Sequence, residues 1–250
     1  MPIPVLRGVI DRRILVNYRV EPAVLGRLLP TTFRPQLVRG WGVAGICLIR
    51  LRRVRPRWLP LPVGLASENA AHRIAVEWDD GGAVRTGVYI LRRETTSRLS
   101  ALAGGPLFPG VHRRADFRVA EGDGRYAVTV ADRAGRSLIE VRGRAANDWP
   151  AGSVFDSLAE ASAFFAAGSV GYSPARRAGD FEGLELRTAG WDVRPLAVEH
   201  VASAVFDDPI VFAPGSVEFD SALVMHDVAH EWHGLARLRT DCGCAAAAVG

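Results

Sequence analysis

The sequence predicts a mainly β protein of the α+β class, with antiparallel strands and a few short helices. Most of the chain alternates apolar and polar residues with a period of two, which is the pattern of a half-buried strand. Turn-forming Gly and Asp residues join neighbouring strands into hairpins. Only two segments carry helix signals, and they do not alternate with strands as a doubly wound parallel sheet requires.

Strands and one short helix account for the N-terminal part of the chain. Residues 13–19 alternate between two faces and predict the first strand. Pro22 favours the start of a helix over 23–29, which ends at Pro30 because the residue before a proline disfavours helical geometry. The apolar run over 41–51 is rich in strand-forming residues and predicts a second strand.

The clearest alternation covers 68–78 and belongs to a predicted hairpin. Asp-Asp-Gly-Gly at 79–82 turns the chain, and 84–92 returns as the second strand. One face of the first strand carries Glu68, Ala70, His72, Ile74, Val76 and Trp78. Further strands are predicted over 116–120, 126–131, 137–144, 184–186, 191–193, 198–206 and 217–225.

A second helix is predicted over 159–167. Ser157 and Glu160 form a capping box, in which each side chain satisfies a free backbone N–H of the first turn. Gly168 suits the C-terminal end of this helix.

Size and composition favour one domain and limit the partners. With 250 residues, of which 48% are hydrophobic, the chain can bury a sizeable core, so we expect one domain over 1–240 and a disordered tail over 241–250.

An odd set of cysteines (Cys47, Cys242 and Cys244) argues against a disulfide framework and predicts a cytoplasmic protein. The basic residues, all arginine, are interspersed with acids, and no apolar run approaches a membrane span, so we expect no nucleic-acid or membrane partner.

Five short motifs share their order and spacing with one known group of proteins. They are Arg-Arg-Ile-Leu-Val-Asn-Tyr-Arg-Val-Glu-Pro from 12 with Leu-Leu-Pro at 28–30, Ala-Ser-Glu-Asn at 66–69, Gly-Val-Tyr at 87–89, the segment 164–173, and Phe-Asp-Ser-Ala-Leu at 219–223. On these motifs the chain resembles the DUF2071 branch of the acetoacetate decarboxylase-like superfamily. The resemblance implies a closed or cone-like antiparallel β-barrel around a small-molecule cavity, and it leaves homo-oligomerisation open.

The superfamily's lysine chemistry is not available to this sequence. In the decarboxylases a lysine forms an imine with a β-keto acid, and a neighbouring cation lowers its pKa. The matching segment is 107–114, where Gly110 and Val111 stand in the place of the lysines, and no lysine occurs anywhere in the chain. Arginine cannot replace it because its pKa is too high to leave a neutral nitrogen. The imidazole of His112 does not form a stable imine.

The resemblance implies two candidate catalytic residues, Glu68 and His112. Glu68 matches the family's cavity glutamate, and a carboxylate that faces an apolar cavity has a raised pKa that suits acid/base work. The alternative is a glutamate at the start of its strand, paired to an arginine. His112 lies next to the segment that has lost its lysine.

Arginines and aromatic residues complete the expected site. Arg12 or Arg13 matches the family's cavity arginine, and Arg98 and Arg113 are candidate clamps for a carboxylate, which guanidinium binds with two hydrogen bonds. The expected cavity lining is Tyr18, His72 and Tyr89. His72 is better explained as a core histidine.

His226, His230 and His233 form the densest titratable cluster. On a helix they would share one face and could hold a metal. On a strand, which the flanking alternation favours, His226 and His230 would share a face and His233 would point away. The His-Glu-x-x-His zinc motif is absent, so we expect no metal and no cofactor in the leading interpretation.

That interpretation is a small-molecule cavity protein that binds or acts on a carboxylated or oxo metabolite without Schiff-base chemistry. If it is an enzyme, the chemistry is acid/base catalysis of the lyase or isomerase type. Two alternatives remain open: a non-catalytic ligand-binding barrel, and a metal-dependent enzyme that uses the histidine cluster.

Overall fold

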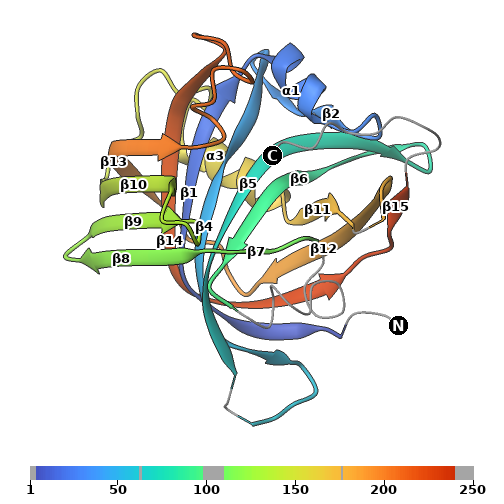
Figure 1. Ribbon diagram of the computed structural model, residues 1–250, viewed down its shortest axis with the longest axis vertical. Coiled ribbons are helices and arrows are strands. Elements are labelled where there is room, and N and C mark those ends of the chain that lie inside the picture. Colours follow the sequence, from blue (N-terminus) through green and yellow to red (C-terminus); the bar gives the residue numbers. More distant parts are fainter. Residues whose placement is uncertain (1–3, 62–63, 98–109, 176, 240–250) are drawn as a thin grey trace.

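The computed structural model describes residues 4–61, 64–97, 110–175 and 177–239 (Figure 1). The helices are α1 (Pro22–Leu28) and α3 (Leu158–Ala167). The strands are β1 (Leu6–Val20), β2 (Arg34–Pro35), β3 (Leu37–Val38), β4 (Trp41–Pro56), β5 (Leu65–Asp80), β6 (Ala83–Thr95), β7 (Arg113–Arg114), β8 (Asp116–Gly122), β9 (Arg125–Ala131), β10 (Ser137–Ala145), β11 (Val170–Pro174), β12 (Asp180–Thr188), β13 (Arg194–Ser203), β14 (Val217–Gly234) and β15 (Leu238–Arg239). The mainly β prediction is confirmed. No helix among these residues is long and apolar enough to cross a membrane.

The long strands close into a ring. Their order is β12-β11-β6-β5-β4-β1-β14, and β14 pairs back onto β12. The pairings are antiparallel, as predicted, except that β11 and β7 each run parallel to β6. Closure removes the free edges that a flat sheet would expose, and it gives the ring an inner and an outer face.

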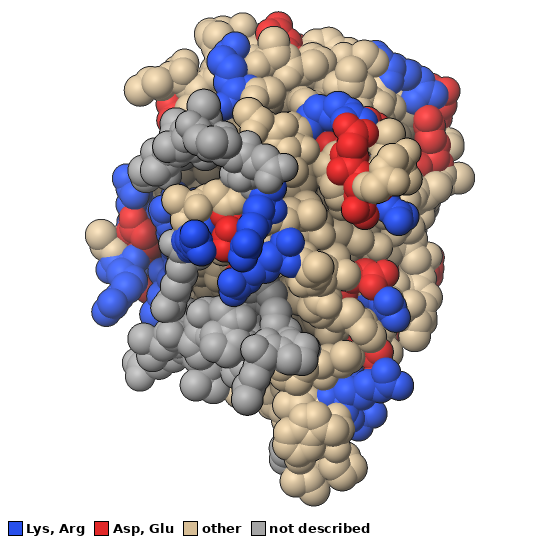
Figure 2. Space-filling model, turned by 90° about the vertical axis from the view of Figure 1, so that its right-hand side faces the viewer, with Lys and Arg blue, Asp and Glu red and all other residues tan. Residues whose placement is uncertain are grey.

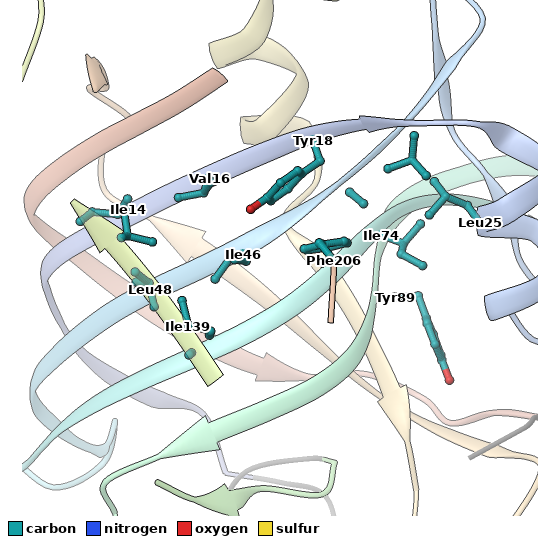
Figure 3. Close-up of a cluster of buried hydrophobic side chains, with 14 of the residues drawn as sticks. Ile14, Val16, Tyr18, Leu25, Ile46, Leu48, Ile74, Tyr89, Ile139 and Phe206 are labelled. Atoms are coloured by element: carbon teal, nitrogen blue, oxygen red, sulfur yellow. The ribbon is translucent and has the colours of Figure 1, made fainter. Parts of the chain in front are cut away.

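A second group of strands covers part of the outer face. Strands β8, β9, β10 and β13 pair in sequence and join the ring through a short β13–β14 contact (Figure 1). Between this group and the ring lies a hydrophobic cluster, in which Ile14 and Val16 of β1 lie near Ile46 and Leu48 of β4 and Ile139 of β10 (Figure 3). Strands β1 and β4 are therefore buried on both faces, since alternating residues pack towards the inside of the ring and towards the second group of strands.

The inner face packs against α3. Its cluster includes Leu15 of β1, Cys47 of β4 and Met225 of β14, together with Phe165 of the helix. Half of the predicted capping box forms: the Ser157 hydroxyl accepts from the Glu160 N–H. The Glu160 carboxylate accepts instead from the N–H of Asp156, before the N-cap, and pairs with Arg39, which fixes the start of the helix against the ring.

Charged side chains are interspersed on the surface. The face in Figure 2 shows arginines and acidic residues side by side rather than one continuous basic field. The predicted tail, 241–250, and its Cys242 and Cys244 lie outside the described residues.

Candidate functional site: an arginine-lined cavity inside the ring

A cavity of about 130 Å³ lies on the inner face. Every strand of the ring contributes a residue to its wall, and α3 closes one side. The apolar part of the lining includes Ile49, Ile90, Phe165, Leu186, Trp191 and Trp232, and the polar part includes Arg13, Cys47, Asn69, Arg73, Arg93 and His112. A cavity of about this size holds a ligand of roughly six non-hydrogen atoms.

Strand register brings the polar residues together. Arg13, Ile49 and Asn69 pair across β1, β4 and β5, and so share one face. The next row along the strands contains Cys47, which pairs with Leu15 on one side and Ala71 on the other. Arg93 of β6 pairs with Ala71 of β5. Arg73 lies on the same face of β5, two residues after Ala71. The arginines therefore surround small side chains that leave the space open.

Arg73 is the most deeply buried of these cations. Its side chain is 4% exposed, and Nη2 donates to Oδ1 of Asn17 at 2.5 Å. The guanidinium carbon lies 4.9 Å from the centroid of the Phe165 ring. Burial lowers the pKa of Arg73 to about 10, so the group is cationic at neutral pH.

Arg93 and Arg13 face the same space. Arg93 donates from Nε and Nη2 to the Ser173 hydroxyl at 3.1 and 2.9 Å, and burial lowers its pKa to about 10. Arg13 donates from Nε to Cys47 Sγ at 3.4 Å and lies over the Trp191 ring, 5.4 Å from its centroid. These contacts hold both guanidinium groups in place.

These three arginines lack a carboxylate partner within the described part of the chain. Their hydrogen bonds go to an amide, a hydroxyl and a thiol, which orient a cation without neutralising it. A buried unpaired charge is costly. The arrangement therefore favours an anion in the cavity.

Glu94 is the one acidic residue that lines this cavity among the described residues. It is 1% exposed and pairs with Arg92. Burial raises the pKa of Glu94, although Arg92 opposes the shift. The Glu94 carboxylate lies beside Arg92 and His72, on the opposite face of β6 from Arg93, so this carboxyl does not point into the cavity.

His112, expected as a catalytic residue, is among the residues that line the cavity. Nδ1 donates to the Gly110 carbonyl at 3.2 Å, which leaves Nε2 unprotonated in the neutral ring. Burial, together with the charge of Arg93, lowers the pKa of His112 to about 4. The imidazole is therefore neutral at physiological pH.

Gly110 lies in a conformation that leaves no room for a side chain. Its φ is 88°, in the region that favours glycine, and a Cβ there would lie 2.7 Å from Ser173 Cβ. Its N–H donates to Glu182 Oε2 at 2.9 Å. Val111, beside it, is exposed.

Glu68 faces away from the cavity, which corrects its expected position. Its Oε2 accepts from Arg12 Nη2 at 2.6 Å and its Oε1 from Arg50 Nε at 2.5 Å. Both arginines also pair with Glu121 of β8. This is the alternative in which Glu68 pairs with an arginine. Arg12, which is 1% exposed, belongs to this group of ion pairs rather than to the cavity.

Tyr18, His72 and Tyr89 also lie on the outer face, so their expected place in the cavity lining is corrected. Tyr18 packs on Phe206, with ring centroids 4.6 Å apart (Figure 3). His72 contacts the Ser203 hydroxyl at 3.1 Å, and burial lowers its pKa to about 3, so its 3.9 Å approach to Glu94 is not an ion pair.

Two further arginines were expected as clamps. Arg113 lies on β7 with its side chain exposed and does not line the cavity. Arg98 lies outside the described residues.

The C-terminal histidines lie on β14 but do not converge. Asp227 has a φ of 53°, and the pairing with β1 skips a residue there. His226 therefore faces outward and bonds Tyr126 Oη at 2.8 Å, whereas His230 is buried on the inner face. The expectation that the two share a face is wrong because Asp227 is left out of the pairing and shifts the alternation by one residue. Across the described residues, no group of three His, Cys, Asp or Glu side chains is placed to hold a metal.

Sequence reasoning missed Arg73, Arg93, Cys47 and Asn69. Arg73 lies between Ala71 and Ala75, and an arginine among alanines on one strand face indicates space beside it. That pattern could have identified the cavity face of β5.

Comparison with known proteins supports this fold. The DUF2071 family profile, described as an uncharacterized conserved protein, matches residues 10–217. The chain belongs to the DUF2071 family. A search of curated proteins finds no match.

Several solved structures are similar to the DUF2071 chain in fold. Acetoacetate decarboxylase from Legionella pneumophila has a TM-score of 0.61 at 12% identity, over 94% of this chain and 89% of that one. An acetoacetate decarboxylase-like enzyme from Sphingomonas wittichii has a TM-score of 0.59 at 16% identity, over 96% and 94%. The enduracididine biosynthesis enzyme MppR, complexed with pyruvate, has a TM-score of 0.59 at 11% identity, over 96% and 91%.

Proposed function

We propose that this DUF2071 protein binds a small carboxylated or oxo-acid anion in the cavity inside the ring. The observation that carries the proposal is that Arg13, Arg73 and Arg93 face one cavity of about 130 Å³ without a carboxylate partner among the described residues. A carboxylate would accept two hydrogen bonds from a guanidinium and offset its charge. The small volume limits the ligand to roughly six non-hydrogen atoms.

The fold relatives support this class of ligand. MppR has been solved in complex with pyruvate, an oxo acid that meets the size limit. Apolar walls from Phe165, Trp191 and Trp232 suit the methyl end of such a molecule. The absence of lysine from the sequence means that an imine is not part of the proposed chemistry.

The chemistry that fits is proton transfer beside the ligand's carbonyl. Arg73 and Arg93 would stabilise negative charge that develops on the carbonyl oxygen. Neutral His112 would accept a proton. This base, together with the two arginines, favours lyase- or isomerase-type chemistry over simple binding.

Ligand-observed NMR tests the binding proposal. Pyruvate should bind the wild-type protein, whereas uncharged pyruvamide and methyl pyruvate should not. Arg73→Gln and Arg93→Gln should each weaken pyruvate binding by about tenfold or more, because a hydrogen bond to a charged group contributes roughly 1.5–3 kcal/mol. Arg85→Gln is the matched control, since Arg85 is exposed on β6. Equal binding of the amide, or no effect of the cavity variants, would refute the proposal.

Hydrogen exchange separates an enzyme from a binder. In D2O an enzyme of this kind should exchange the methyl protons of pyruvate faster than buffer does, and His112→Ala should slow that exchange while pyruvate still binds. Binding without accelerated exchange would establish the ligand-binding barrel instead.

A further inference from the structure

We propose that Cys47 is a nucleophilic thiol of the cavity that adds reversibly to the carbonyl carbon of a bound oxo acid. The inference rests on the proposed function for the identity of the ligand. It assigns a chemical role to a residue on β4, a different strand from the segment that has lost its lysine.

Cys47 lies among the cavity arginines. Its Sγ accepts from Arg13 Nε at 3.4 Å, and the side chain is 8% exposed, into the cavity that it lines. Arg73 and Arg93 lie close enough that a thiolate at Cys47 would raise the pKa of both. The thiolate is the nucleophilic form of cysteine, and the three guanidinium groups line the cavity beside Cys47.

A second observation points to a ligand beside this thiol. Arg73 is 96% buried, yet its Nε has no hydrogen-bond partner among the described residues. A buried donor without an acceptor is costly, so a ligand oxygen at this nitrogen would be stabilising. The ligand's anionic end would then lie within the ring of residues around Cys47.

The neighbours of Cys47 leave its sulfur accessible. Ala71, which pairs with Cys47 across β4 and β5, carries only a methyl group. A bulkier residue at Ala71 would fill space beside the thiol, since Ala71 and Cys47 both line the cavity.

The proposed step is an addition without oxidation or reduction. The Sγ–C bond forms as the carbonyl π bond breaks, and the thiol proton ends on the former carbonyl oxygen. The product is a hemithioketal, and the reverse step returns the thiol and the oxo acid. Arg73 and Arg93 would stabilise the oxygen while it carries negative charge.

Selective alkylation tests the thiol. The protein would carry Cys242→Ser and Cys244→Ser, so that Cys47 is its one thiol, and would be treated with iodoacetate or with uncharged iodoacetamide. The ratio of the iodoacetate to the iodoacetamide rate should be about tenfold higher for Cys47 than for glutathione, because the cavity attracts the anion. Pyruvate should slow the labelling. Arg93→Gln should lower the ratio, and Arg85→Gln should not.

Carbon NMR tests the adduct itself. With pyruvate labelled with ¹³C at its carbonyl carbon, a protein-bound resonance should appear in the sp³ region. This resonance should be absent with Cys47→Ser. A signal from hydrated pyruvate would remain in that variant, so the comparison separates the two.

The two tests separate this inference from the proposed function. A Cys47 that labels with the same preference as glutathione, or a bound sp³ resonance that survives Cys47→Ser, would overturn the role of the thiol. If pyruvate still binds in that case, the proposed function stands alone. If pyruvate binds neither the wild type nor Cys47→Ser, the proposed function fails as well.

Discussion

Arg73 and Asn17 are joined by a hydrogen bond of 2.5 Å between Nη2 and Oδ1 across the inner face of the ring. Asn17 is fully buried, so the amide fixes the position of the guanidinium. A neutral amide leaves the positive charge uncompensated. The cation is thus oriented in advance for an anion, and this costs stability in the empty protein.

Replacing Arg73 with methionine should therefore separate stability from binding. Without ligand, the free energy of unfolding of Arg73→Met should stay the same or rise by about 1–2 kcal/mol, because an apolar residue of similar volume removes a buried unpaired charge. Pyruvate should stabilise the wild type and not the variant. Urea denaturation with and without pyruvate measures both effects, and a variant that pyruvate still stabilises would contradict the role of Arg73.

Glu68 should matter for stability and not for the cavity. Glu68→Gln removes the carboxylate that joins Arg12 and Arg50 on the outer face. We expect a loss of about 1–3 kcal/mol in the free energy of unfolding, because buried Arg12 keeps only Glu121 as a charged partner among the described residues. Pyruvate affinity should be unchanged. A large loss of affinity at wild-type stability would restore Glu68 to the site.

Buried histidines should make the protein less stable in mild acid. Burial lowers the pKa of His72 to about 3 and of His112 and His230 to about 4, from an ordinary 6.5. At a pH between the native pKa values and 6.5, these histidines are protonated in the unfolded chain and neutral in the native protein. The free energy of unfolding therefore falls as the pH drops from 6.5 towards 4. Above the unfolded pKa the histidines are neutral in both states, so they add no pH dependence to the free energy of unfolding.

Urea midpoints at pH values of about 7.5, 6 and 5 check this expectation. His230→Leu should flatten part of the slope, since neither ring nitrogen of His230 has a hydrogen-bond partner among the described residues. Midpoints that do not change over this range would contradict the prediction.

Gly110 should tolerate no side chain. Gly110→Ala should lower the free energy of unfolding by more than the roughly 1–2 kcal/mol of left-handed backbone strain, because the new methyl would collide with Ser173. It should also weaken pyruvate binding, since Ser173 holds Arg93. Gly135→Ala is the matched control: its φ is 85° and nothing lies within 4 Å of the added carbon. Equal losses for the two variants would show that the contact with Ser173 is unimportant.

Alternation predicted the strands but could not show which strand face encloses the cavity. Both faces of β5 are buried, one by α3 and the cavity and the other by the outer strands, so apolar neighbours of Glu68 did not mark the inner side. The irregularity at Asp227, which separates His226 from His230, has no local signal such as glycine. The family resemblance predicted the fold and pointed to His112 as a candidate residue. Arg73 and Arg93 required the register between strands.

A crystal structure of the protein grown with pyruvate would show where the ligand binds. We expect pyruvate in the cavity within the ring, with its carboxylate in hydrogen-bond contact with Arg73 or Arg93. Pyruvate bound instead on the outer face, at Arg12 and Glu68, or a cavity that holds only water at saturating pyruvate, would contradict this expectation.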